Sequence, residues 1–121
     1  MLGNGPAPVG IGPDGVLVYV APGPGNIFDG STWGGNKVLW AVAPGTDGDV
    51  LVRGHQLDGP GGLGFGLDLT PGAELVLPAG TKPLPGGWRD FPNTTRLQHP
   101  GCYAYQVDTA STSNIVVFVA R

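Results

Sequence analysis

Residues with the types that catalysis needs are few and scattered in this sequence. The candidate bases are the two histidines, His55 and His99. The loop serines that could act with them are Ser31, Ser111 and Ser113. No serine stands in the strand–turn–helix context that exposes a catalytic nucleophile, and Glu74 is the sole glutamate, so a glycosidase would need two aspartates from separate loops. The sequence predicts no catalytic site, and we expect the protein not to be an enzyme.

Motifs for cofactors and metals also lack the context that they require. Residues 10–15 and 59–64 match the dinucleotide pattern GxGxxG, but neither opens a helix that could receive a pyrophosphate. Asp47 and Asp49 are typical of a turn, whereas calcium requires about six to eight oxygen ligands. Cys102 is the only cysteine, so it is expected to pack as a small apolar side chain. No cofactor and no metal are predicted.

The clearest candidates for ligand binding are two tryptophans in segments without a strand pattern. Trp33 and Trp88 lie in Gly-rich stretches, and Arg89 directly follows Trp88. Exposed tryptophans beside polar groups can stack on a sugar ring or hold a peptide. In the alternative interpretation they close the open ends of the fold, with Trp88 and Phe91 holding down the long loop that begins at Pro78. Trp33, Trp88 and Arg89 are therefore the candidate ligand-binding residues, and both interpretations stay open.

The elements that position these residues are short apolar runs separated by Gly and Pro. The chain contains 23 Gly and 13 Pro, and those between the runs predict turns. Apolar alternation predicts strands over residues 16–20, 37–43, 49–57, 63–69, 73–77, 94–98, 101–108 and 114–121. In the strand over 63–69, Leu67 and Leu69 belong to the inward face and the glycines favour a sheet edge. No helix is expected, because Gly and Pro interrupt almost every helical window.

The last third of the chain organises the expected fold. Tyr103, Tyr105 and Val107 alternate onto one face, and a polar turn then leads into a β-branched run, which together predict a final hairpin. Trp40 is expected in the core. Short strands without helices are typical of an antiparallel sandwich or barrel. A chain of 121 residues forms one such domain, in which residues 1–13 are an extended Gly/Pro-rich lead on the surface.

The charge pattern narrows the range of partners. The net charge is −3, and the six Lys and Arg residues are scattered, so they form no basic stripe for a phosphate backbone. No apolar run approaches the roughly 20 residues of a membrane-spanning helix. Residues 1–6 also lack the charged and apolar regions of a signal peptide. We expect neither a nucleic acid partner nor a membrane span.

Residues 101–105 resemble the tyrosine corner of immunoglobulin-like domains. In that motif, a Tyr near the start of the penultimate strand donates a hydrogen bond to backbone upstream. The resemblance implies that Tyr103 is the corner residue and that Tyr105 occupies the place of the second cysteine of antibody domains. It favours an antiparallel immunoglobulin-like β-sandwich of about seven to eight short strands over a barrel.

A second resemblance covers most of the chain. Segments 37–40, 50–61, 87–92 and 100–108 together resemble the signatures of small bacterial exported or lipid-anchored proteins with an immunoglobulin-like sandwich. The resemblance implies an extracellular or cell-surface location, with the export signal absent from this chain. It implies no activity and brings no functional residues.

Two functions of different classes fit these observations. The first is a non-catalytic extracytoplasmic module for protein interaction or structural assembly, whose exposed strand edges and loops contact a protein partner or a second copy. The alternative is a carbohydrate-binding module that uses Trp33 and Trp88. Loss of glycan binding on replacing either tryptophan with alanine would favour the alternative.

Overall fold

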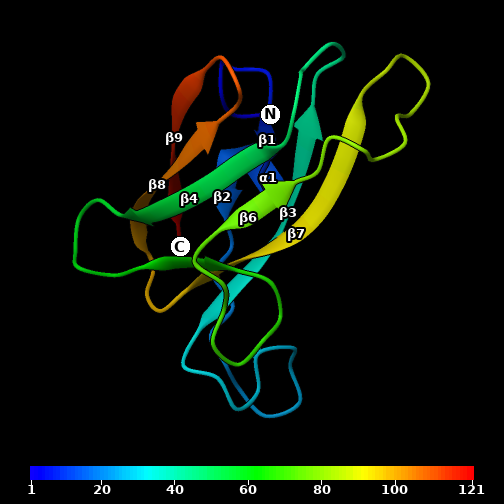
Figure 1. The fold of residues 1–121 in the computed structure, drawn as a ribbon. Helices are drawn as coiled ribbons and strands as arrows, with labels where there is room; N and C mark the ends of the chain where they lie inside the picture. Colours follow the sequence, from blue (N-terminus) through cyan, green and yellow to red (C-terminus); the bar gives the residue numbers. More distant parts are fainter.

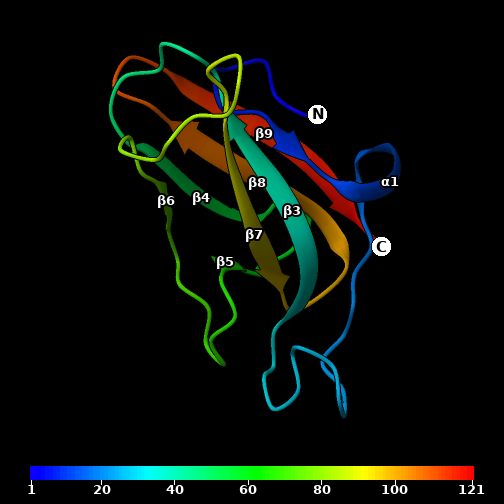
Figure 2. The same cartoon turned by 90° about the vertical axis from the view of Figure 1, so that its right-hand side faces the viewer.

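The apolar runs of the sequence form nine strands, which pair into two sheets (Figure 1). The computed structural model describes residues 1–121. Sheet A has the order β1-β3-β7-β5, with the bounds Val9–Gly10, Gly34–Val42, Arg89–Leu97 and Leu63–Phe65. Sheet B has the order β2-β9-β8-β4-β6, with the bounds Val16–Leu17, Ser113–Ala120, Gly101–Asp108, Val50–Gln56 and Leu75–Leu77. The long strands of the two sheets lie in separate layers (Figure 2).

The prediction of an all-β sandwich is confirmed, but the pairing is not wholly antiparallel. Strands β2 and β9 run parallel, which makes sheet B mixed. The parallel pair arises because the N-terminal segment changes sheets: β1 pairs with β3, β2 pairs with β9, and Val20 then bridges to Gly35 of sheet A. The strand predicted over 16–20 is therefore divided between the two sheets.

The predicted C-terminal hairpin is confirmed as the pair β8–β9, which stays in register from Gly101–Ala120 to Asp108–Ser113. Tyr103 and Tyr105 have no exposed surface and Val107 is 2% exposed. These three side chains face sheet A, as alternation along the strand predicts. The hairpin therefore supplies one wall of the core.

Tyr105 is the centre of the contact between the sheets. Its ring packs edge-on against Trp40 at 4.9 Å between centroids and stacks on Phe118 at 4.7 Å. Its hydroxyl is 2.6 Å from Oγ1 of Thr95 on β7, so a hydrogen bond joins sheet B to sheet A within the core. Trp40 is fully buried, as expected. Aromatic packing and one hydrogen bond therefore join the two sheets at the centre of the core.

A hydrogen bond from Tyr103 stabilises the start of β8. The hydroxyl of Tyr103 donates a hydrogen bond to the backbone oxygen of His99 at 2.7 Å. This bond spans the turn between β7 and β8 and fixes the entry into the hairpin. The hydrogen bond that the sequence predicts for Tyr103 is therefore confirmed.

The N-terminal lead contributes to the core, which corrects the expectation that residues 1–13 lie on the surface. Val9 is fully buried and Ala7 is 3% exposed. Leu2 pairs with Val9 through two backbone hydrogen bonds of 2.8 and 2.9 Å. The segment is extended as predicted, but its apolar side chains face inward. It ends in α1 (Gly12–Gly15), where Pro13 and Asp14 have the dihedral angles of a type II turn.

The strand predicted over 63–69 is wrong beyond Phe65. Leu67 is 61% exposed and Leu69 is 64% exposed, so the inward alternation stops. The chain turns at Gly66, whose φ of +90° lies in the left-handed region that glycine favours. Strand β5 is the edge strand of sheet A, which confirms the predicted edge position.

Strand β7 extends well beyond the segment 94–98 that the sequence predicts. The strand already begins at Arg89, directly after Trp88, and its Pro92 lies opposite Leu39 of β3. Strand β5 pairs only with Thr95–Leu97, so Pro92 has a partner strand on one side alone. A proline is tolerated at such an edge position. The structure has no helix with the length and apolar character that crossing a bilayer requires.

Alkaline titration tests the burial of the tyrosines. Desolvation raises the pKa of Tyr19, Tyr103 and Tyr105, which are the three tyrosines of the chain. Because the pKa values are raised in the folded protein, the stability that the buried tyrosines contribute is fully present below a pH of about 10. It is lost as the pH rises further, since the tyrosines of the unfolded chain ionise first. We expect the phenolates of Tyr103 and Tyr105, which have no exposed surface, to form only as the near-ultraviolet circular dichroism is lost. Ionisation of more than one tyrosine with an unchanged dichroism spectrum would contradict this burial.

Candidate functional site

The two candidate tryptophans lie at opposite ends of the β3–β7 pair. Trp33 precedes Gly34, which pairs with Leu97, and Trp88 precedes Arg89, which pairs with Val42. Eight residue steps of about 3.4 Å separate these ends, which is about 27 Å. The structure does not bring Trp33 and Trp88 together, so they cannot form one stacking surface for a sugar.

Arg89 binds the protein's own backbone. The side chain is 8% exposed. Its guanidinium donates hydrogen bonds to the backbone oxygens of Pro78 at 3.2 Å, Ala79 at 2.6 Å and Thr46 at 3.4 Å. The long loop after Pro78 is therefore fastened by Arg89, whereas Trp88, which the sequence suggested for this role, is 41% exposed. Arg89 has a structural explanation that needs no ligand.

Arg96 performs the same task at the other end of β7, and sequence reasoning missed it. The residue is only 1% exposed although it lies on the outer face of sheet A. Its guanidinium donates five hydrogen bonds of 2.7–3.3 Å, to the backbone oxygens of Trp33 (two bonds), Gly66 and Asp68 and to Oγ of Ser31. Charged donors make the stronger protein hydrogen bonds. Arg96 thus ties two loops, residues 26–33 and 66–70, to one strand.

The surroundings of Arg96 explain why it can be buried there. Its cross-strand neighbours are Gly35 on β3 and Gly64 on β5, so no side chain stands directly opposite it on either strand. The guanidinium carbon lies 4.9 Å from the centre of the Phe28 ring, a cation–π contact. Desolvation lowers the pKa of Arg96, and the charge of Asp68 opposes this shift. The pair of glycines is the sequence signal, but it becomes visible only once the strand register is known.

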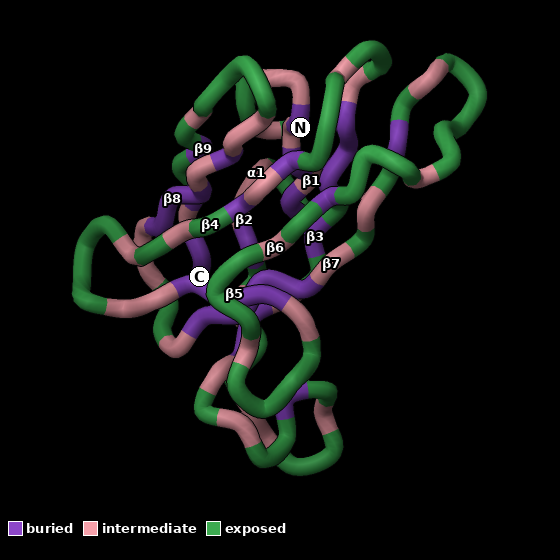
Figure 3. The backbone as a smooth tube through the Cα atoms, in the orientation of Figure 1, coloured by how far each residue is buried: buried purple, intermediate pink, exposed green.

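The loops that Arg96 fastens expose three large aliphatic side chains. Ile27 is 57% exposed, Leu67 is 61% exposed and Leu69 is 64% exposed. Each directly neighbours a residue that bonds to Arg96 or stacks on it. We call Ile27, Leu67 and Leu69 the loop platform. The two loops lie side by side at the lower end of the molecule and are mostly exposed (Figure 3).

The charges around the loop platform are acidic. Residues 26–33 and 66–70 contain two ionisable side chains, Asp29 and Asp68, and both are exposed. The buried Arg96 compensates one of these charges, so one net negative charge remains. Exposed apolar side chains with acidic neighbours in the same loops complement a partner that has apolar and basic side chains.

The loops of the platform are ordered by local hydrogen bonds as well as by Arg96. Oδ1 of Asn26 accepts from the amide of Phe28 at 2.9 Å, and the backbone oxygen of Asn26 accepts from the amide of Asp29 at 3.1 Å. Oγ of Ser31 donates to the backbone oxygen of Leu69 at 2.6 Å, which joins the two loops directly. The exposed aliphatic side chains therefore stand on a braced support.

The strand edges are poor sites for adding a further strand. The backbone oxygen of Thr94 accepts a hydrogen bond from the amide of Gly66 at 3.1 Å. Thr94 and every second residue of β7 therefore direct their backbone N–H and C=O groups away from β3, toward the side that β5 covers only in part. Pro92 is the next residue in this series and has no N–H to offer. The other edge strands, β1, β2, β5 and β6, are two or three residues long. Short edges and proline are devices that prevent strand addition.

The surface hollows show no arrangement for a cofactor or a metal. A hollow of about 370 Å³ lies between the turns at residues 43–47 and 109–112. The hydroxyls of Thr109 and Thr112 lie 2.6 Å apart and that of Thr46 donates to Ala43, so these groups bond within their own turns. Asp49 accepts from the amide of Ala79 at 2.8 Å, which gives it a structural partner. No three His, Cys, Asp or Glu side chains gather as metal ligands.

The loop platform on its Arg96 support is the strongest candidate site that the geometry offers. It was absent from the sequence-based candidates, because alternation assigned Leu67 and Leu69 to the core. Comparison of the chain with protein-family models, with curated proteins and with solved structures found no match.

Proposed function

We propose that this protein is a non-catalytic β-sandwich module that binds another protein through the loop platform. One observation carries the proposal. A buried arginine makes five hydrogen bonds to brace two loops, and those loops expose Ile27, Leu67 and Leu69. Bracing reduces the entropy that loops lose on binding, and exposed aliphatic side chains supply apolar area to bury.

The partner that fits best is a protein segment with apolar side chains flanked by Lys or Arg. Apolar side chains would cover Leu67 and Leu69, and the basic groups would meet Asp29 and Asp68. An anionic lipid surface is a poorer match, because the two carboxylates would repel it.

We further propose that the sandwich is of the immunoglobulin-like type and acts outside the cytoplasm. The hydrogen bond of Tyr103 to His99 and the buried Trp40 against Tyr105 support the type. The location follows from the resemblance to bacterial exported or lipid-anchored proteins. The carbohydrate alternative loses support, because Trp33 and Trp88 lie at opposite ends of the sandwich.

Selection of peptides from a random library displayed on phage tests the proposed function. We expect peptides enriched on the wild-type protein to combine apolar residues with Lys or Arg. Replacing both leucines, Leu67→Asp and Leu69→Asp, should weaken their binding by at least about tenfold, since burial of one leucine is worth about 1.5–3 kcal/mol. Both side chains are more than half exposed, so the double variant should fold normally.

The control is Leu39→Asp, which makes the same substitution once, on the outer face of sheet A, where Leu39 is 38% exposed. This variant should bind the selected peptides as the wild type does. Equal binding by the double variant and the wild type would show that the platform is not the site.

A further inference from the structure

The outer face of sheet B is a second surface without a covering element. Its side chains come from alternate positions of the three central strands. The register places them in cross-strand rows: Leu51, Asp108 and Ser113; Arg53, Gln106 and Ile115; His55, Ala104 and Val117; and finally Cys102 and Val119. The first two rows contain most of the polar groups, and the last two are mainly apolar.

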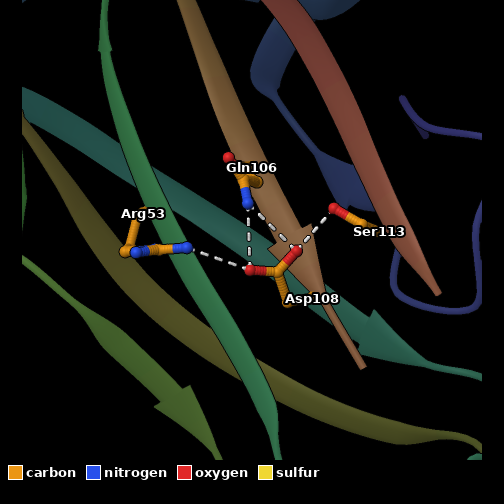
Figure 4. A network of polar contacts seen from close by, with 4 residues as sticks. All are labelled: Arg53, Gln106, Asp108 and Ser113. Atoms are coloured by element: carbon orange, nitrogen blue, oxygen red, sulfur yellow. Dashed lines mark hydrogen bonds and ion pairs between the residues drawn. The ribbon is translucent and has the colours of Figure 1, made fainter. Parts of the chain in front are cut away.

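Four polar side chains of this face, Arg53, Gln106, Asp108 and Ser113, form one hydrogen-bonded network (Figure 4). The carboxylate of Asp108 accepts from Oγ of Ser113 at 2.6 Å, from Nε2 of Gln106 at 3.1 and 3.2 Å, and from Nη2 of Arg53 at 3.2 Å. The bonds from Ser113 and Gln106, followed by the contact with Arg53, lower the pKa of Asp108. The face therefore carries one paired positive and one paired negative charge at neutral pH.

The apolar part combines projecting side chains with a hollow beside them. Ile115 is 61% exposed and Val117 is 52% exposed on β9. The short side chain of Ala104 on β8 leaves a hollow of about 230 Å³ next to them, lined by Arg53, Gly54, His55, Ala104, Tyr105, Gln106 and Ile115. Pockets for small ligands are usually about 300–1,000 Å³. This hollow is below that range, which suits one side chain of a protein partner.

We propose that this face binds a second copy of the same chain around a twofold axis. An axis parallel to the strands, between β8 and β9, places β9 of one copy opposite β8 of the other. Residues that share a cross-strand row then meet, so Val117 lies over the Ala104 hollow of the second copy and Val119 lies over its Cys102. By the same symmetry, Val117 and Val119 of the second copy lie over the Ala104 hollow and Cys102 of the first, as a twofold interface requires.

The charge of the face supports a second copy as the occupant. The chain carries a net charge of −3, so two copies repel each other at most orientations. On this face the charged pair Arg53–Asp108 sums to zero, and two such faces can approach without net repulsion. Self-association should therefore depend only weakly on ionic strength.

The size of the face predicts a weak, reversible dimer. The four strands β2, β9, β8 and β4, spaced by about 4.8 Å, and rows that span about 20 Å give a footprint of about 400 Å² per copy. The total of about 800 Å² is below the range of about 1,200–2,000 Å² that stable specific interfaces bury. We expect a dissociation constant on the order of 100 µM, because interfaces of this size rarely bind tightly.

Analytical ultracentrifugation of the full chain over a wide range of concentrations tests this proposal. We expect the wild type to shift from monomer to dimer, and Val117→Lys to raise the dissociation constant at least about tenfold, since it places two charges in an apolar contact. The control Leu39→Lys makes the same change on sheet A and should dimerise as the wild type does. Far-ultraviolet circular dichroism verifies the fold of each variant.

Two outcomes would overturn the inference: a wild type that stays monomeric at every concentration, or a Val117→Lys variant that dimerises as the wild type does. The loop platform is separate from this face, so the Leu67→Asp and Leu69→Asp double variant should dimerise normally. Failure of dimerisation therefore leaves the peptide-binding proposal intact, and the two proposals fail separately.

Discussion

Replacing Arg96 with methionine is expected to lower the free energy of unfolding by about 3 kcal/mol. Methionine keeps much of the apolar stem but removes all five hydrogen bonds, so the backbone oxygens of Trp33, Gly66 and Asp68 lose their donor. Urea unfolding followed by tryptophan fluorescence measures the change. Arg96→Lys should recover little of the loss, because one ammonium group cannot reproduce the geometry of the guanidinium.

The matched control is Arg53→Met. Arg53 is also on a central strand, but its side chain is 48% exposed and makes one ion pair with Asp108 at 3.2 Å. Exposed pairs contribute at most about 1 kcal/mol. If Arg96→Met and Arg53→Met destabilise the protein equally, Arg96 does not fasten the loops.

Gly35→Ala should have the largest effect of any single methyl group added to this chain. Gly35 has a φ of +135°, and a Cβ there would lie 1.8 Å from the backbone oxygen of Thr95 on β7. Neither atom belongs to a flexible side chain, so the β3–β7 pair would have to separate locally. We expect a loss of at least about 4 kcal/mol, or failure to fold, on thermal or urea unfolding.

Gly80→Ala is the control for this substitution. Gly80 has no atom within 4 Å of the added Cβ and its φ is not in the left-handed region. Its replacement should change stability by less than about 0.5 kcal/mol. A small effect at Gly35, comparable to that at Gly80, would mean that β3 and β7 do not pack as closely as the register indicates.

The parts of the fold that the sequence predicts best are those where local pattern and burial agree. Tyr103, Tyr105 and Val107 alternate in a strand that has no Gly or Pro after Gly101, and this strand and its partner form the hairpin as expected. Trp40 stands in an uninterrupted apolar run and is buried. In these segments the alternation that favours a strand also places the apolar side chains in the core, so the sequence alone predicts both the strand and its burial.

The candidate site could not be predicted, because tertiary contacts override the local pattern there. Alternation places Leu67 and Leu69 inward, but Arg96, distant in sequence, takes the backbone oxygens of Gly66 and Asp68 and turns the chain outward. Pro92 similarly prevents the first half of β7 from being predicted as a strand. The structure tolerates this proline because no second partner strand needs its N–H there. Departures from the local rules often mark functional sites, and the loop platform is such a departure.

The two buried arginines of β7 each hold loops at one end of the strand. Arg89 fastens the loop after Pro78 at one end, and Arg96 fastens the loop platform at the other. Apart from the bond of Arg96 to Oγ of Ser31, both act on backbone oxygens, so most side chains of the loops can vary without loss of this support. Sheets of aromatic and β-branched residues then serve as a frame for braced loops, an arrangement suited to binding.

Backbone ¹⁵N relaxation of the wild-type protein in solution tests the central claim most directly. If Arg96 holds a preformed binding surface, residues 26–33 and 66–70 should have order parameters near those of the strands, about 0.85. Values below about 0.6 in these loops, alongside rigid strands β8 and β9, would contradict the account.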